Sequence, residues 1–145
     1  MLRNTKTYEY TKMKNELNKK DLIYPELCYR VMGILFEVWT NLGSGHKEKI
    51  YQEAIAKELE NSKLNFKREL PVKIIYKNKP IGIYYFDFII EEKLILEVKV
   101  RNYFSIKDIK QLYSYLKSKD LKLGVIAHFT GMGVKFKRVV NIKQG

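Results

Sequence analysis

Hydrophobic positions change their spacing several times along the chain, and each change predicts a different element. Apolar residues recur at spacings of three and four over Pro25–Leu42 and again over about 46–61, which predicts two amphipathic helices. A third pattern of this kind starts after Ser105, whose spacing to Asp108 resembles a capping box, and runs to about residue 119. The sequence therefore predicts two helices near its start and a third well separated from them.

Between the second and third helices, the spacing becomes that of strands. Alternation over 66–76 and apolar runs over 81–90 and 93–100 predict three strands joined by tight turns. Pro71 favours an edge position or a bulge for the first strand, because proline has no backbone N–H to donate. We therefore expect an α/β fold of order αβββαβ, with helices flanking a mixed sheet, and two last strands over 121–129 and 134–140.

Two charges interrupt the run over 93–100, which otherwise reads as a buried central strand. Glu97 and Lys99 are two residues apart, so they point to the same face of that strand. Removing water from an unpaired ion costs several kcal/mol or more. The pair is therefore either a structural salt bridge or a chemical site.

Asp87 is the one charge in the preceding strand, and the turn Glu91-Glu92-Lys93 decides where it points. If the turn has three residues, Ile90 pairs with Leu94 and Asp87 falls opposite Glu97. A two-residue turn would place the two carboxylates on opposite faces of the sheet. The chemistry considered next requires the first register, or a bulge that restores it.

Asp87, Glu97 and Lys99 have the spacing of the PD-(D/E)XK arrangement found in Mg²⁺-dependent nucleases. Mg²⁺ prefers oxygen ligands and keeps several waters, so two carboxylates and the backbone carbonyl of Val98 would suit it. Lys99 beside the metal could orient or deprotonate the attacking water and stabilise charge on the phosphate. Glu48 lies on the core-facing stripe of the second helix and is either a further ligand or an ordinary first-turn acid. We rank a purely structural ion pair below this site, because buried ion pairs rarely gain stability over apolar packing.

Composition narrows the setting in which this site would work. The net charge is +12, and the excess lies in the N-terminal segment and the second half of the chain, which suggests a polyanionic partner. We interpret residues 1–21 as a basic arm, mobile or loosely helical, and residues 22–145 as one domain. A single cysteine, Cys28, a polar start and no apolar run long enough to cross a bilayer indicate a cytoplasmic protein without membrane contact.

The segment Gly45-His-Lys-Glu-Lys-Ile-Tyr51 resembles the signature of the GxxExxY protein family, a branch of the PD-(D/E)XK nuclease superfamily. The resemblance covers roughly residues 22–141, and Gln111 with Tyr115 resembles the QxxxY motif of RecB-like nucleases. It implies a restriction-endonuclease-like fold and assigns the catalytic and metal-binding roles to Glu48, Asp87, Glu97 and Lys99. By the same resemblance, Gln111 and Tyr115 would support them.

The leading hypothesis is a metal-dependent phosphodiesterase that hydrolyses DNA, with Mg²⁺ as the cofactor and Mn²⁺ as a substitute. Arg101 and Lys107, in the basic part of the chain, join Tyr115 as candidates for positioning the substrate. Nucleic acid is the expected partner, DNA before RNA, and a homodimer is considered. Two alternatives remain: a nucleic-acid-binding module that kept the fold without catalysis, and a subunit whose basic face docks an acidic protein.

Overall fold

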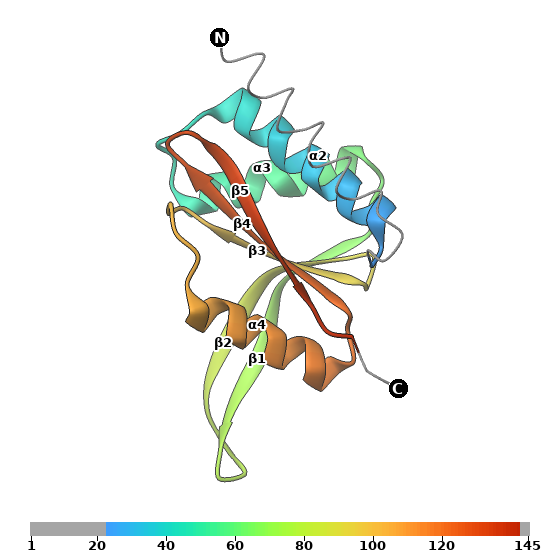
Figure 1. The fold of residues 1–145 in the computed structure, drawn as a ribbon, viewed down its shortest axis with the longest axis vertical. Helices are drawn as coiled ribbons and strands as arrows, with labels where there is room; N and C mark the ends of the chain where they lie inside the picture. Colours follow the sequence, from blue (N-terminus) through green and yellow to red (C-terminus); the bar gives the residue numbers. More distant parts are fainter. Residues whose placement is uncertain (1–22, 143–145) are drawn as a thin grey trace.

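The computed structural model describes residues 23–142, which contain three helices and five strands (Figure 1). The predicted N-terminal arm, residues 1–21, lies outside the described residues. The helices span Pro25–Leu42 (α2), Glu48–Asn61 (α3) and Ile106–Lys119 (α4), close to the predicted bounds. The strands span Phe66–Tyr76 (β1), Lys79–Ile90 (β2), Leu94–Lys99 (β3), Leu123–Thr130 (β4) and Gly133–Val140 (β5).

One mixed sheet connects all five strands in the order β1-β2-β3-β4-β5. β3 and β4 are parallel, and the other neighbouring pairs are antiparallel. The parallel pair needs a crossover connection, which α4 provides. The predicted αβββαβ order and mixed sheet are confirmed, and Pro71 lies on an edge strand, β1, as expected.

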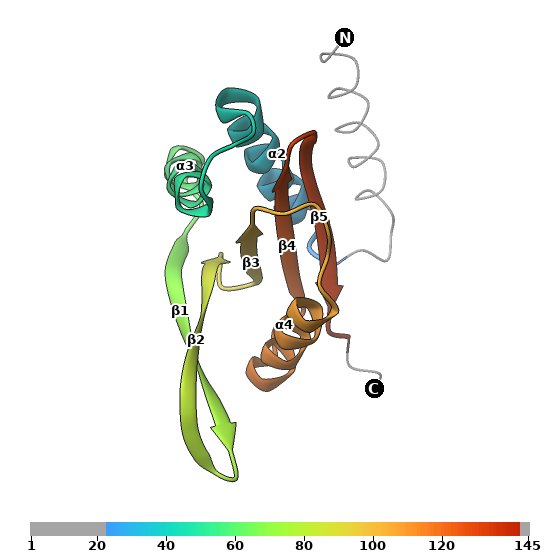
Figure 2. The ribbon, with the colours of Figure 1, turned by 90° about the vertical axis from the view of Figure 1, so that its left-hand side faces the viewer.

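Two apolar cores lie on the two faces of the sheet. α2 and α3 cover one face, where Cys28 is buried and the ring of Tyr51 stacks on Phe129 at 4.2 Å between centroids. α4 covers the other face through Leu112 and Leu116 (Figures 1 and 2). The sheet is thus held between helices over β3 and β4.

The turn between β2 and β3 has three residues, Glu91 to Lys93, and Ile90 pairs with Leu94. This is the register that the site requires. The backbone is left-handed at Glu91 and Glu92, with φ of 54° and 56°, a conformation that costs a side-chain-bearing residue some stability.

β1 and β2 form a long hairpin that leaves the rest of the sheet (Figure 2). Opposite Asp87, the backbone of Glu69 has a φ of 55°, although the register of the hairpin is the same before and after this point. Phe88 belongs to the core under α2 and α3, whereas Phe86 belongs to the core under α4. Because both residues have the same parity in the strand, the hairpin must twist strongly between them.

The outer part of the hairpin, residues 71–85, is called the hairpin arm below. Its turn consists of Lys77 and Asn78, both with positive φ, as in a two-residue type I′ hairpin. β2 therefore begins at Lys79, two residues before the predicted run over 81–90. Ile74 and Tyr76, which belong to the alternating pattern over 66–76, are exposed, because the arm extends past the helices that cover the sheet.

The packed face of α4 carries one of its two neighbouring tyrosines and leaves the other exposed. Tyr115 is buried and its ring lies 4.9 Å from that of Phe86, whereas Tyr113 is exposed. Leu112 and Leu116 complete the buried side. The twist of the hairpin brings Phe86 under α4, and this creates the place that Tyr115 occupies.

Candidate active site

Glu97 is buried in the sheet with only 4% of its surface exposed. Its Oε1 accepts a hydrogen bond of 2.8 Å from the backbone N–H of Asp87, and its Oε2 accepts one of 2.7 Å from the hydroxyl of Tyr84. The Nζ of Lys99 lies 3.6 Å from the same Oε2. The predicted same-face pair of Glu97 and Lys99 is thus present, at the end of β3.

Asp87 reaches back from β2 in the same way. Its Oδ2 accepts a hydrogen bond of 2.7 Å from the backbone N–H of Val98, and its Oδ1 accepts one of 3.0 Å from the side-chain amide of Gln52. The backbone pairing of β2 and β3 runs from Ile90–Leu94 to Phe88–Leu96. Hydrogen bonds from the backbone to the two carboxylates therefore replace backbone–backbone pairing at the point where β2 turns away from β3.

Both carboxyl groups lie in surroundings that disfavour a negative charge. Burial, followed by the charge of Asp87, raises the pKa of Glu97 to about 7. Burial is also the largest cause of the raised pKa of Asp87, and the charge of Glu48 adds to it. Two close, poorly hydrated carboxylates are a pattern typical of catalytic and metal-binding sites.

Glu48 is the first residue of α3 and is half-buried. Its charge contributes to the raised pKa of Asp87, and its role as a metal ligand stays a prediction. Gln52 follows one turn later on the same side of α3 and makes the hydrogen bond to Asp87. Tyr51 fixes the start of this helix, because its hydroxyl donates to the carbonyl of Gly43 at 2.6 Å.

The candidates for supporting roles lie around α4. Arg101 makes an ion pair of 3.0 Å with Asp108, and Lys107 is exposed in the first turn of α4. Gln111 is half-buried on the same helix, and Tyr115 packs in the core below it. The structure thus brings Asp87, Glu97 and Lys99 together, whereas the roles of Glu48, Gln111 and Tyr115 stay predictions.

Three polar residues near the site were missed by the sequence reasoning. Gln52 could have been found, because it lies four residues after Glu48 on one helix face. His128 could also have been found, because it interrupts the apolar run of β4, as Glu97 interrupts that of β3. Tyr84 could not, because residues three apart in a flat strand point to opposite faces, and the twist of β2 brings its hydroxyl to Glu97.

His128 is paired with Lys99 in the parallel register and stacks on Phe104, with 4.0 Å between ring centroids. Among the described residues, neither of its ring nitrogens has a hydrogen-bond partner. Burial, aided by the charge of Arg101, lowers the pKa of His128 to about 4. The imidazole is therefore neutral at neutral pH and adds no positive charge beside Lys99.

The donor set at Asp87 and Glu97 suits a hard divalent cation. Within residues 23–142, no three side chains of His, Cys, Asp and Glu are close enough together to form a metal site by themselves. Magnesium sites in proteins, however, commonly use one or two carboxylates and complete the shell with water and substrate phosphate. Each carboxylate oxygen here accepts one hydrogen bond and has a second lone pair to offer.

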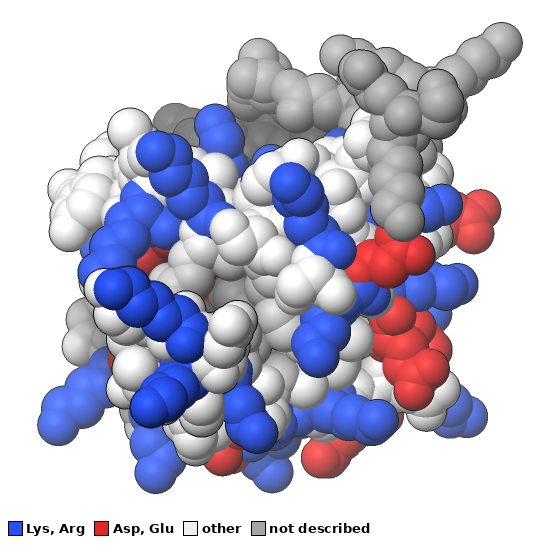
Figure 3. Space-filling view, turned by 90° about the horizontal axis from the view of Figure 1, so that it is seen from below, with Lys and Arg blue, Asp and Glu red and all other residues white. Residues whose placement is uncertain are grey.

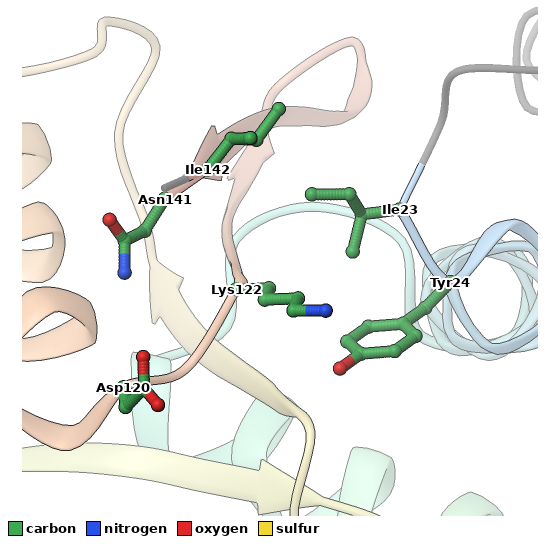
Figure 4. Close-up of a pocket in the computed structure, with 6 residues that line it drawn as sticks. All are labelled: Ile23, Tyr24, Asp120, Lys122, Asn141 and Ile142. Atoms are coloured by element: carbon green, nitrogen blue, oxygen red, sulfur yellow. The ribbon is translucent and has the colours of Figure 1, made fainter. Parts of the chain in front are cut away.

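A separate cavity of about 490 Å³ lies beside the end of α4 and the last described strand (Figure 4). It contains none of the site residues, and its lining includes Ile23 and Ile142, the first and last described residues. No helix among the described residues is both long and apolar enough to cross a membrane.

Comparison with known proteins gives a family match over most of the chain. A model of the PD-(D/E)XK nuclease superfamily matches residues 25–139. An alkaline exonuclease from Laribacter hongkongensis has a similar solved structure, with a TM-score of 0.47 and 11% identity over 89% of this chain and 75% of that one. The solved structure of SSO0001 gives a TM-score of 0.49 and 14% identity over 99% and 80% of the two chains. No curated protein gave a significant match.

Proposed function

The chain belongs to the PD-(D/E)XK nuclease superfamily, and from that premise we propose that it hydrolyses phosphodiester bonds in DNA with the help of Mg²⁺. One observation carries the proposal: Asp87 and Glu97 meet across two diverging strands with raised pKa values, and Lys99 lies 3.6 Å from Glu97. The segment Gly45–Tyr51, with Gln111 and Tyr115 on α4, supports placing the chain in the GxxExxY branch of the superfamily.

The metal would be held by Asp87, Glu97 and the backbone carbonyl of Val98, with Glu48 as a further ligand, direct or through water. Once bound, it would supply a positive charge that binds the scissile phosphate and favours ionisation of water. Mn²⁺ has similar oxygen preferences and would substitute. Gln52 and Tyr84 would hold the two carboxylates in place through their hydrogen bonds.

Lys99 is the residue that would act on the attacking water. Its ammonium group is near the carboxylates but is only partly buried, so it can reach solvent and substrate. From there it can orient the water, take up its proton when deprotonated, and stabilise the charge that develops on the phosphate. Arg101 and Lys107 lie further along the chain and would contact flanking phosphates.

Substitutions that preserve side-chain shape test this mechanism. Asp87→Asn and Lys99→Met should each reduce Mg²⁺-dependent DNA cleavage by about 100-fold or more, because each removes a charge that acts on the reacting groups. The measurement is cleavage of plasmid and oligonucleotide DNA in Mg²⁺, Mn²⁺ and EDTA, with RNA in parallel. Glu53→Gln and Lys93→Met, which remove exposed charges elsewhere, serve as controls. Cleavage that survives both site substitutions, or that persists in EDTA, would count against the proposal.

A nucleic-acid-binding module without catalysis is the second candidate. It is favoured by the hydrogen bond on each carboxylate oxygen and by the absence of a third ligand side chain close to the pair among the described residues. In that case wild-type protein would bind DNA with strong salt dependence and would not cleave it, whichever metal ion is added. The same assay, with binding measured beside cleavage, separates the two candidates.

A further inference from the structure

The hairpin arm carries exposed apolar residues that contribute nothing to either core. Ile75, Ile81, Ile83 and Tyr85 are each between 55% and 64% exposed. Large apolar side chains exposed together on one element are typical of binding surfaces in soluble proteins. Resting on the proposed function, we propose that the arm binds the DNA duplex on one side of the scissile bond, and so extends the active site into a longer binding track.

The arm is anchored at the active site and is therefore fixed relative to it. Tyr84, on the inner face of the arm, donates its hydroxyl to Glu97 at 2.7 Å. At the root of the arm, the ring of Phe86 packs against Tyr115 of α4. The arm then extends past α4 (Figures 1 and 2). A ligand held along the arm would consequently lead towards Asp87 and Glu97.

The outer face of the arm combines apolar side chains with lysine. Lys73 pairs with Ile83 across the hairpin, and Pro71 pairs with Tyr85, so these four residues share one face. Ile is β-branched and stiff, which suits packing against a sugar or groove wall better than stacking on a base.

The charge of the arm favours an anionic partner over a second copy of this chain. Residues 71–85 contain Lys73, Lys77 and Lys79 and no acidic residue. Figure 3 shows the molecule from below, the direction in which the arm points in Figure 1. Lys and Arg spread over this face, while the visible acidic side chains gather mainly towards one edge. Two arms packed together would bring like charges into contact, whereas a phosphate backbone would neutralise them.

The dimensions of a two-stranded ribbon match the proposed ligand. The major groove of B-DNA, about 12 Å wide, admits a β-ribbon. From Asp87 to Asn78 there are nine residues of nearly continuous strand, which span about 30 Å at about 3.3 Å per residue. That reach corresponds to about nine base pairs at about 3.4 Å each. The arm should therefore affect long duplexes and leave short ones unaffected.

The test compares DNA affinity across duplex lengths in EDTA, so that cleavage plays no part. The triple variant Lys73→Glu/Lys77→Glu/Lys79→Glu is matched by the control Lys57→Glu/Lys63→Glu/Lys137→Glu, which changes the net charge equally at exposed sites outside the arm. For duplexes of about 30 base pairs, the arm variant should lower the slope of log K against log salt by up to about 3, since each lost phosphate contact removes about 0.9. The deficit relative to the control should shrink for duplexes of about 8 base pairs.

Ile83→Ser tests the apolar part independently, because Ile83 is exposed and its replacement leaves both cores intact. This variant should weaken long-duplex binding while the salt slope stays the same, because the lost contact is not ionic. Equal losses in the arm and control variants at every length would overturn the proposal. So would a wild-type dimer that Ile83→Ser converts to a monomer with unchanged DNA affinity. Absence of cleavage in wild-type protein would refute the proposed function and leave the binding result standing.

Discussion

The carboxyl group of Glu97 accepts hydrogen bonds from Asp87 and Tyr84, yet it lies where water cannot solvate its charge. Its pKa of about 7, against an ordinary value of 4.5, means that the folded protein still holds a proton that the unfolded chain has released. Stability therefore falls as the pH rises from about 4.5 to 7. A fold selected for stability alone would place an apolar residue here.

Glu97→Gln should consequently raise the free energy of unfolding at pH 8 by about 1–3 kcal/mol, because the neutral amide needs no hydration of a charge. The gain should nearly vanish at pH 5, where the wild-type carboxyl is protonated in the folded state. Urea denaturation in EDTA at the two pH values measures this difference. If Glu97→Gln lowers the free energy of unfolding equally at both pH values, the hydrogen bonds that the carboxyl group accepts stabilise the fold more than burial of its charge destabilises it.

Some residues of the site could be predicted from the sequence and others could not. Asp87, Glu97 and Lys99 were found because each interrupts an apolar strand, and a charge in such a place needs a reason. Tyr84 was not found, because strict alternation places it on the face away from Asp87. The position of its hydroxyl depends on the twist of β2, which no local pattern encodes.

Among the elements, α4 and β4 approach each other closely at Gly124. A Cβ built on this glycine would lie 2.7 Å from the side chain of Leu112, closer than atoms in contact can come. Leu112 is fully buried against the sheet, so it has little room to move. Gly124, which pairs with Ile95 of β3, thus sets the distance between α4 and the sheet.

Gly124→Ala should therefore lower the free energy of unfolding by about 1–3 kcal/mol through overpacking. Gly82→Ala is the matched control, because the nearest atom to its added Cβ is 3.7 Å away. Alanine is usually better than glycine inside a strand, so the control should be neutral or slightly stabilising. Urea denaturation of the two variants gives the comparison, and an unchanged midpoint for Gly124→Ala would refute the packing argument.

The helices were predicted well because a period of 3.6 is distinctive over four or five turns, and α2 begins and ends at the predicted residues. The hairpin was predicted less well. Alternation over β1 is regular in the sequence, but the twist at Glu69 gives its two halves different environments. Ile74 and Tyr76 continue the apolar pattern into a part of the strand that no helix covers.

At the scale of the whole molecule, a net charge of +12 on 145 residues acts against the compact state through self-repulsion. The ion pair Lys67–Glu92 is exposed and the pair Arg68–Glu53 is partly exposed, and exposed pairs contribute little to stability. Screening of the net charge should therefore outweigh the loss of these pairs when salt is added.

Raising NaCl from about 20 mM to about 300 mM should increase the melting temperature by about 2–4 °C, because a shorter Debye length screens the repulsion among the excess basic side chains. Sucrose at matched osmolality, which adds no ions, is the control for general solvent effects. Thermal unfolding followed by circular dichroism measures the shift. A melting temperature that falls with salt would show that specific ion pairs dominate over net charge.

The sequence by itself determined the element types, the mixed α/β order, and the three charges on buried strands, because periodicity and misplaced charge are local properties of the chain. It also showed that the register between the strands of Asp87 and Glu97 depends on one property, the number of residues in the turn at Glu91 to Lys93. Only the tertiary structure decided that this turn has three residues and that the carboxylates replace the backbone pairing between diverging strands. Only the tertiary structure also decided that the hairpin arm is exposed, since its exposure depends on where the helices that cover the sheet end.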